Sequence, residues 1–234
     1  MIEEVRKEIF KLLEKENSGH GTDHVERVLR LSLKFAKKEN ANQEVVALIA
    51  LLHDVDDYKL FGDENAENLT NAKNILANCS VDDNIQKQVL NAIKTMGYSK
   101  RLKGISPETI EGKIVSDADM CDGLGATTIL RTQLYHFKHN SPFFDKNIFP
   151  ISDINSENYE ICSATGVCHM FEKILRLKDL MLTDAGKKEA LERHKIVVDF
   201  LYHLFAEENV PEWTEYLDNY LKGSENHSLS YGRK

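Results

Sequence analysis

The residues of this chain that could do chemistry gather where an apolar run ends in His53 and Asp54. The preceding segment, Val45 to Leu52, contains only Val, Ala, Leu and Ile, which indicates a helix buried on nearly all sides. A carboxylate at the buried end of such a helix needs a partner, and a divalent cation suits both side chains. The alternative is a structural pair, in which His53 donates to a backbone carbonyl and Asp54 caps the next segment. The metal interpretation therefore requires further ligands elsewhere in the chain.

Two other segments offer such ligands. His24 begins a helix predicted over about 24–39 and shares its apolar face, so its ring should point inward. The helix predicted over 107–122 carries three further candidates: Asp117, Asp119 and Asp122. Because helices of a bundle can direct side chains to a single core site, we expect His24, His53, Asp54 and one of these aspartates to hold one ion.

The elements that must position these residues are all predicted to be helices. Helical periodicity covers the segments 1–16, 24–39, 45–52, 66–77, 82–96, 107–122, 127–137, 167–181, 187–207 and 212–221. The basic stretch 97–106 is predicted to be a loop. No segment alternates as a strand would, so the expected fold class is all-α. We expect one domain over 1–222, with an irregular insertion or lid at 138–165, and a flexible C-terminal tail at 223–234.

Composition excludes several classes of partner. A net charge of -8 at pH 7 argues against a binder of nucleic-acid polymers, but a small phosphorylated ligand is compatible because a bound cation can reverse the local field. No apolar run approaches the roughly 20 residues that cross a bilayer, so no membrane partner is expected. Four cysteines without a Cys-x-x-Cys pair, and no apolar signal segment, predict free thiols in a cytoplasmic compartment. The apolar face of the last helix could close the core or form a homodimer.

Three stretches carry a resemblance to a known family. They are GHGTDHVERV at 19–28, LHDVDDYK at 52–59 and EGKIVSDAD at 111–119. Their order resembles the signature of the HD-domain superfamily of metal-dependent phosphohydrolases, which is a His, then His-Asp, then a distant Asp. The run from His169 to Leu175, through Arg193-His194, looks like one soluble, single-domain bacterial branch. The resemblance implies a compact helical bundle of the HD-domain type.

The resemblance also implies roles for individual residues. It gives His24, His53, Asp54 and Asp119 as metal ligands, because the last ligand of the family is the aspartate of an Ala-Asp segment. Asp57 matches an acidic group that accepts or aims the proton of the attacking water. Asp122 shares the face of Asp119 and is expected to touch a ligand hydroxyl or water, whereas Asp117 points elsewhere as a capping or supporting group.

Two departures from the family concern substrate contacts. Met120-Cys121 stands where relatives commonly have Arg-Leu, and the segment 96–99 stands where many carry His-Ser.

Three further residues near the motifs are candidates for substrate contact or catalysis. Arg27 and Lys59 could bind phosphate oxygens, although Arg27 could instead form a surface ion pair with Asp23. His20, next to a predicted helix start, could donate to a phosphate or protonate the leaving group. The alternative for His20 is a loop hydrogen bond.

The ligand set suits an open six-coordinate ion, with Mn²⁺ or Mg²⁺ expected first and Fe²⁺, Co²⁺ or Ni²⁺ also compatible. The expected function is hydrolysis of a phosphate ester or anhydride, and the resemblance implies a nucleotide substrate. Two alternatives stay open: a phosphodiesterase of cyclic or linear nucleotides, and a non-catalytic protein that binds a nucleotide through the metal.

Overall fold

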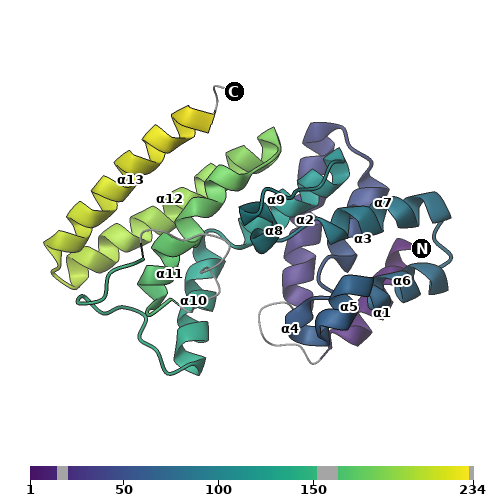
Figure 1. Cartoon of the computed structure of the whole chain (residues 1–234), viewed down its shortest axis with the longest axis horizontal. Helices are drawn as coiled ribbons and strands as arrows, with labels where there is room; N and C mark the ends of the chain where they lie inside the picture. Colours follow the sequence, from purple (N-terminus) through teal and green to yellow (C-terminus); the bar gives the residue numbers. More distant parts are fainter. Residues whose placement is uncertain (15–20, 152–162, 232–234) are drawn as a thin grey trace.

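The structure, a computed structural model, describes residues 1–14, 21–151 and 163–231, with side chains described up to residue 223. Within these ranges every regular element is a helix, which confirms the all-α prediction. The elements are α1 (Ile2–Leu12), α2 (Thr22–Glu39), α3 (Gln43–Leu52), α4 (Tyr58–Phe61), α5 (Asp63–Asn68), α6 (Thr70–Asn78), α7 (Asp83–Lys94), α8 (Tyr98–Leu102), α9 (Ile110–Asp122), α10 (Ala126–Lys138), α11 (Gly166–Glu172), the 3-10 helix η1 (Ile174–Leu180), α12 (Asp184–Glu207) and α13 (Pro211–Tyr231). Figure 1 shows α1 to α7 on one side of the molecule, α10 to α13 on the other, and α9 between them.

The core is one continuous cluster of buried apolar side chains centred on α2, α3 and α9. Every residue of α3 from Val45 to Leu52 is buried, as its unbroken apolar sequence predicts. Each such Val, Ile or Leu stabilises the fold by about 1.5–3 kcal/mol when it leaves water. At the other end, Trp213 and Leu217 of α13 are fully buried, so the apolar face of the last helix closes the core. No described helix has the length and apolarity needed to cross a membrane.

Several predicted boundaries were wrong, for local reasons. The helix expected over 66–77 is divided into α5 and α6, because Leu69 adopts a left-handed conformation with φ 52°. Helix α9 begins at Ile110 and not at Pro107, because the Thr109 side chain accepts from the Gly112 N–H and caps the helix there. The segment expected to be a loop at 97–106 contains the short helix α8.

The helix expected over 167–181 is also interrupted. Lys173, with φ −132° and ψ −57°, separates α11 from the 3-10 helix η1. Beyond it, α13 continues to Tyr231, into the segment expected to be flexible.

The described parts of the expected insertion, 139–151 and 163–165, contain no helix. They are nevertheless attached to the core: Phe149 stacks on Trp213 with ring centroids 4.4 Å apart, and the Trp213 Nε1–H donates to the Lys146 carbonyl at 3.0 Å. This stretch therefore covers α13. Residues 152–162 of the expected lid lie outside the described residues.

Helix α10 turns its polar side inward. Thr128, Thr132 and His136 are buried, whereas Leu130 and Phe137 are 73% and 74% exposed. The inward face carries hydrogen-bonding groups toward α9, where Thr128 Oγ1 donates to the Asp122 carbonyl at 3.3 Å. Polar groups are thus placed along the boundary between the two sides of the molecule.

Candidate metal centre

Three mutually packed helices bring the four predicted ligands together. His24 lies in the first turn of α2, Asp119 lies in α9, and His53 and Asp54 directly follow α3. Because α3 is buried from Val45 to Leu52, its C-terminal end delivers His53 and Asp54 into the interior.

The ligand atoms converge on one point. The Nε2 atom of His24 lies 3.1 Å from Nε2 of His53, 3.3 Å from Oδ2 of Asp54 and 3.4 Å from Oδ1 of Asp119. The Nε2 atom of His53 lies 3.4 Å from Asp54 Oδ2 and 3.8 Å from Asp119 Oδ1. For an ion with ligands near 2.1 Å, adjacent donor atoms lie about 3 Å apart, so these separations fit a divalent cation. The ligand atoms of His24, His53 and Asp119 lie close enough together to hold one metal ion, and the carboxylate of Asp54 lies next to them.

Both imidazoles, when neutral, direct an unprotonated nitrogen at this point. The Nδ1–H of His24 donates to Asp122 Oδ2 at 2.8 Å, and the Nδ1–H of His53 donates to the Ala50 carbonyl at 2.8 Å. An ionised carboxylate and a carbonyl can only accept, so each neutral ring carries its proton on Nδ1. Two Nε2 lone pairs and two carboxylates then face one another, which is stable only around a cation. This donor set fits the expected metal.

The charges of the site reinforce this conclusion. Burial lowers the pKa of His24, but the carboxylates of Asp119, Asp122 and Asp54 outweigh it and raise the pKa to about 11. Burial raises the pKa of Asp119, and the neighbouring His24 and His53 outweigh it and hold that pKa below its usual range. The site therefore attracts positive charge, either a proton or a metal ion. The Asp119 side chain keeps 30% of its surface exposed, so this is the side from which a substrate can approach.

Asp122 is bound to supporting residues around the site. Its carboxylate is 2% exposed and accepts from His24 Nδ1, from Arg27 Nε at 2.7 Å and Nη2 at 3.1 Å, and from Arg131 Nη1 at 3.2 Å. Four hydrogen bonds occupy its acceptor sites, and the same contacts hold its pKa well below the usual range although burial opposes them. These contacts orient His24, and the expected contact of Asp122 with a ligand hydroxyl or water stays a prediction.

Arg27 is also committed to other protein groups. It forms the bidentate pair with Asp122, and its Nη1 donates to Asp23 Oδ2 at 2.7 Å. The alternative raised by the sequence, an ion pair with Asp23, is therefore present, and the expected binding of phosphate oxygens is not what its surroundings favour.

The other predicted residues stand apart from the four ligands. Asp57 accepts from the Lys59 N–H through Oδ1 at 2.9 Å and caps α4. Lys59 is exposed, with its Nζ 5.6 Å from the centre of the Tyr58 ring. Within the described residues no hydrogen bond or ion pair joins either side chain to the ligands. His20 lies outside the described residues.

Asp117 joins the two sides of the molecule. It is fully buried, and its carboxylate accepts from the Leu182 N–H, the Thr183 N–H at 2.7 Å and Thr183 Oγ1 at 2.7 Å. It thereby fixes the turn before α12, the capping task expected for it. A Cβ atom added at Gly186 would lie 2.2 Å from Asp117 Oδ2, so only glycine fits there.

Two cations near the site were not predicted. Arg131 of α10 reaches Asp122, and Lys173 is close enough to Asp119, Lys59 and Arg131 for their charges to act on it. Neither lies in the three stretches that match the metal signature, and both come from elements that approach the site only through the tertiary fold.

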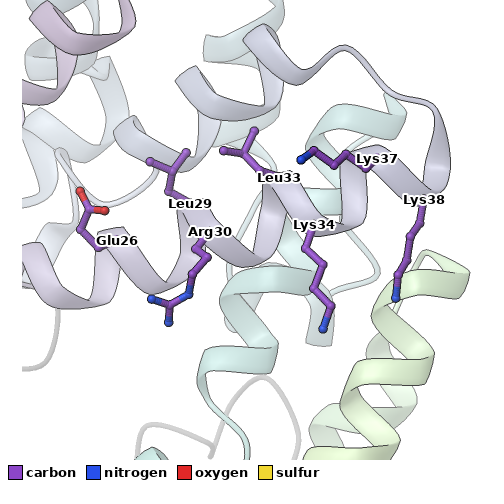
Figure 2. Close-up of a pocket in the computed structure, with 7 residues that line it drawn as sticks. All are labelled: Glu26, Leu29, Arg30, Leu33, Lys34, Lys37 and Lys38. Atoms are coloured by element: carbon purple, nitrogen blue, oxygen red, sulfur yellow. The ribbon is translucent and has the colours of Figure 1, made fainter.

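A groove on the outer face of α2 is separate from this centre. Figure 2 shows its lining, which comprises Glu26, Leu29, Arg30, Leu33, Lys34, Lys37 and Lys38 around a volume of about 720 Å³. These residues lie on the side of the helix opposite His24. Its only carboxylate, Glu26, is paired with Arg6 at 2.6 Å, so the groove offers no metal ligand.

The fold and the four converging ligands define a class of protein. Residues 21–124 match the HD domain family model. The chain belongs to the HD-domain superfamily and falls in the class of HD-superfamily hydrolases.

Individual relatives match over nearly the whole chain. The uncharacterized protein YpgQ of Bacillus subtilis (strain 168) is 31% identical over 211 residues, which are 89% of this chain and 93% of YpgQ. A Lactobacillus plantarum protein of known structure is 30% identical, with a TM-score of 0.74 over 92% of this chain and 97% of its own. An HD-superfamily hydrolase of Bacillus thuringiensis is 31% identical, with a TM-score of 0.70 over 89% and 97%. YpgQ in complex with ADP aligns with a TM-score of 0.68 at 25% identity, over 91% of this chain and all of that structure.

Proposed function

We propose that the protein is a metal-dependent phosphohydrolase that cleaves a phosphate ester or anhydride in a nucleotide. The observation that carries this proposal is the convergence of the Nε2 atoms of His24 and His53 with two carboxylates, beside the exposed edge of Asp119. A divalent ion held there, Mn²⁺ or Mg²⁺, supplies a water whose pKa falls from about 16 towards about 7 and a positive charge beside the phosphoryl group. The ADP complex of YpgQ supports a nucleotide as the ligand.

The chain itself supplies the remaining parts of the mechanism. Asp122 and the Ala50 carbonyl keep the protons of His24 and His53 on Nδ1, so both Nε2 atoms remain ligands. Asp57 uses one carboxylate oxygen to cap α4, and we assign the other to accept the proton of the attacking water. Lys59 lies in the first turn of α4, two residues after Asp57, and contributes positive charge for the phosphate oxygens.

A substrate panel tests the proposal. Purified protein with Mn²⁺ is assayed against nucleoside mono-, di- and triphosphates and a cyclic nucleotide, and orthophosphate and pyrophosphate are measured separately. We expect metal-dependent release of one of these products, and loss of at least a thousandfold in kcat/KM for Asp54→Ala. The control is Asp63→Asn, which changes an exposed acidic residue in the first turn of α5.

Each negative result has a distinct meaning. Turnover that survives Asp54→Ala would place catalysis elsewhere. Nucleotide binding without any turnover would identify a non-catalytic binding protein, and cleavage restricted to the cyclic substrate would identify a phosphodiesterase.

A further inference from the structure

Lys173 comes from the C-terminal side of the molecule but lies against the N-terminal side. It occupies the non-helical position between α11 and η1. Its Nζ atom stands 4.9 Å from the centre of the Tyr98 ring, which belongs to α8. A cation over an aromatic face is attracted by the ring, so Tyr98 fixes the direction in which this flexible side chain points. Tyr98 lies in the segment where the sequence departs from the pattern common in HD proteins.

The charges around Lys173 do not balance. Burial and the nearby cations Lys59 and Arg131 lower its pKa to about 8, while only Asp119 acts in the opposite direction. No ion pair holds Lys173 within the described part of the chain, although other lysines there, such as Lys178, have carboxylate partners. A metal ion at the proposed centre would engage Asp119, the carboxylate that acts on Lys173, and would leave Lys173 beside the cations Lys59 and Arg131. Cations held together in this way favour binding of an anion.

The three cations also come from different parts of the fold. Lys59 lies in α4, Arg131 in α10 and Lys173 after α11, and the charges of Lys59 and Arg131 act on Lys173. Arg131 is already bound to Asp122, and Lys59 is exposed. Lys173 is thus the partly buried cation whose donors are not committed to a carboxylate in the described structure.

We propose that Lys173, oriented by the ring of Tyr98, binds phosphate oxygens of the substrate and so joins the C-terminal side of the molecule to the metal centre. This inference rests on the proposed function, since it assigns a phosphate-binding residue to the same site. Lys173 donates its N–H groups to the anion, and Tyr98 is a positioning residue that does not touch the substrate.

Calorimetric titration of the Mn²⁺-loaded protein with inorganic pyrophosphate tests the proposal without relying on turnover. We expect Lys173→Met to weaken binding roughly 10- to 100-fold, as loss of one charged hydrogen-bonding group does, and Lys173→Arg to retain most of the affinity. Tyr98→Leu should weaken binding several-fold, whereas Tyr98→Phe, which keeps the ring, should not. The matched control is Lys178→Met, whose lysine is paired with Asp179 on η1.

Direct titration with Mn²⁺ separates this effect from damage to the metal centre. Lys173→Met should bind Mn²⁺ at least as tightly as the unmodified protein, because a repelling charge near Asp119 is removed. If Lys173→Met fails to fold, judged by circular dichroism, Lys173→Gln replaces it.

The outcomes distinguish the two proposals. Binding that depends on Lys173 in a protein without turnover would support this assignment and refute the proposed function. Unchanged pyrophosphate affinity and unchanged KM in an active Lys173→Met protein would refute this assignment and leave the function standing. A protein that does not bind pyrophosphate at all would also overturn the assignment.

Discussion

Replacing Asp122 by asparagine separates the support of the metal centre from the ligands themselves. The substitution keeps the size of the side chain but removes the charge that His24, Arg27 and Arg131 share. The amide oxygen can still accept from His24 Nδ1, but the amide NH₂ then faces a guanidinium group. We therefore expect both the stability of the fold and its affinity for metal to fall.

The structure sets the size of each loss. Removing one partner of a fully buried ion pair costs about 3–5 kcal/mol. The side chains of Arg27 and Arg131 keep 23% and 32% of their surface exposed, so water relieves part of the penalty, and we expect about 2–3 kcal/mol. Loss of a carboxylate that orients a ligating histidine typically lowers metal affinity by about 10- to 100-fold.

Two measurements check these values. Urea unfolding in the presence of EDTA gives the free energy of unfolding, and calorimetric titration gives the Mn²⁺ affinity of the folded protein. The control is Asp23→Asn, which removes only the ion pair of a 75% exposed side chain with Arg27 and should cost less than about 1 kcal/mol. If Asp122→Asn bound Mn²⁺ within twofold of the unmodified protein, Asp122 would not be what orients His24.

Three further predictions concern stability and metal binding. Burial lowers the pKa of His194 to about 4, whereas its pKa in the unfolded chain is about 6.5. The contribution of neutral His194 to stability is therefore present above about pH 6.5 and is lost as the pH falls toward 4. Thermal unfolding of His194→Leu should depend less on pH across this window than that of the unmodified protein. Gly186→Ala should lower the free energy of unfolding in urea by about 2–4 kcal/mol, because the new methyl group meets Asp117. Gly223→Ala, in α13 with open space around it, should raise that free energy by up to about 1 kcal/mol. Equal effects of the two substitutions would show that the contact with Asp117 is not rigid. Mn²⁺ at about 100 times its Kd should raise the free energy of unfolding by about 2.7 kcal/mol in the same assay, and EDTA should reverse this gain. A similar gain in His53→Ala would place the ion elsewhere.

The sequence could predict the residues that converge at the candidate metal centre because their positions depend on local features. An apolar run that ends in His53-Asp54, a histidine on the inner face of α2 and an aspartate on the inner face of α9 can each be recognised within one helix. The choice of Asp119 over Asp117 and Asp122 required the family pattern. The three lie within two turns of one helix, and only their tertiary partners distinguish them.

The supporting residues could not be predicted in the same way. Asp122 and Arg131 meet through the packing of α9 against α10, and helix periodicity would place Leu130 and Phe137 of α10 inward, where the structure exposes them. Lys173 adopts a non-helical conformation because α11 ends at Glu172, although the sequence there continues an apparent helical pattern. Such features depend on contacts between distant segments, and one sequence carries no local signal for them.

The burial of α3 from Val45 to Leu52 links the proposed chemistry of the protein to its hydrocarbon packing. The eight residues from Val45 to Leu52 have no face in water, and the chain places His53 and Asp54 immediately after them. A cavity or an oversized side chain anywhere along this helix can therefore displace two ligands at once, by an amount that the dense interior does not absorb. Random mutagenesis scored for loss of metal should accordingly find many of its hits among aliphatic positions that never approach the ion.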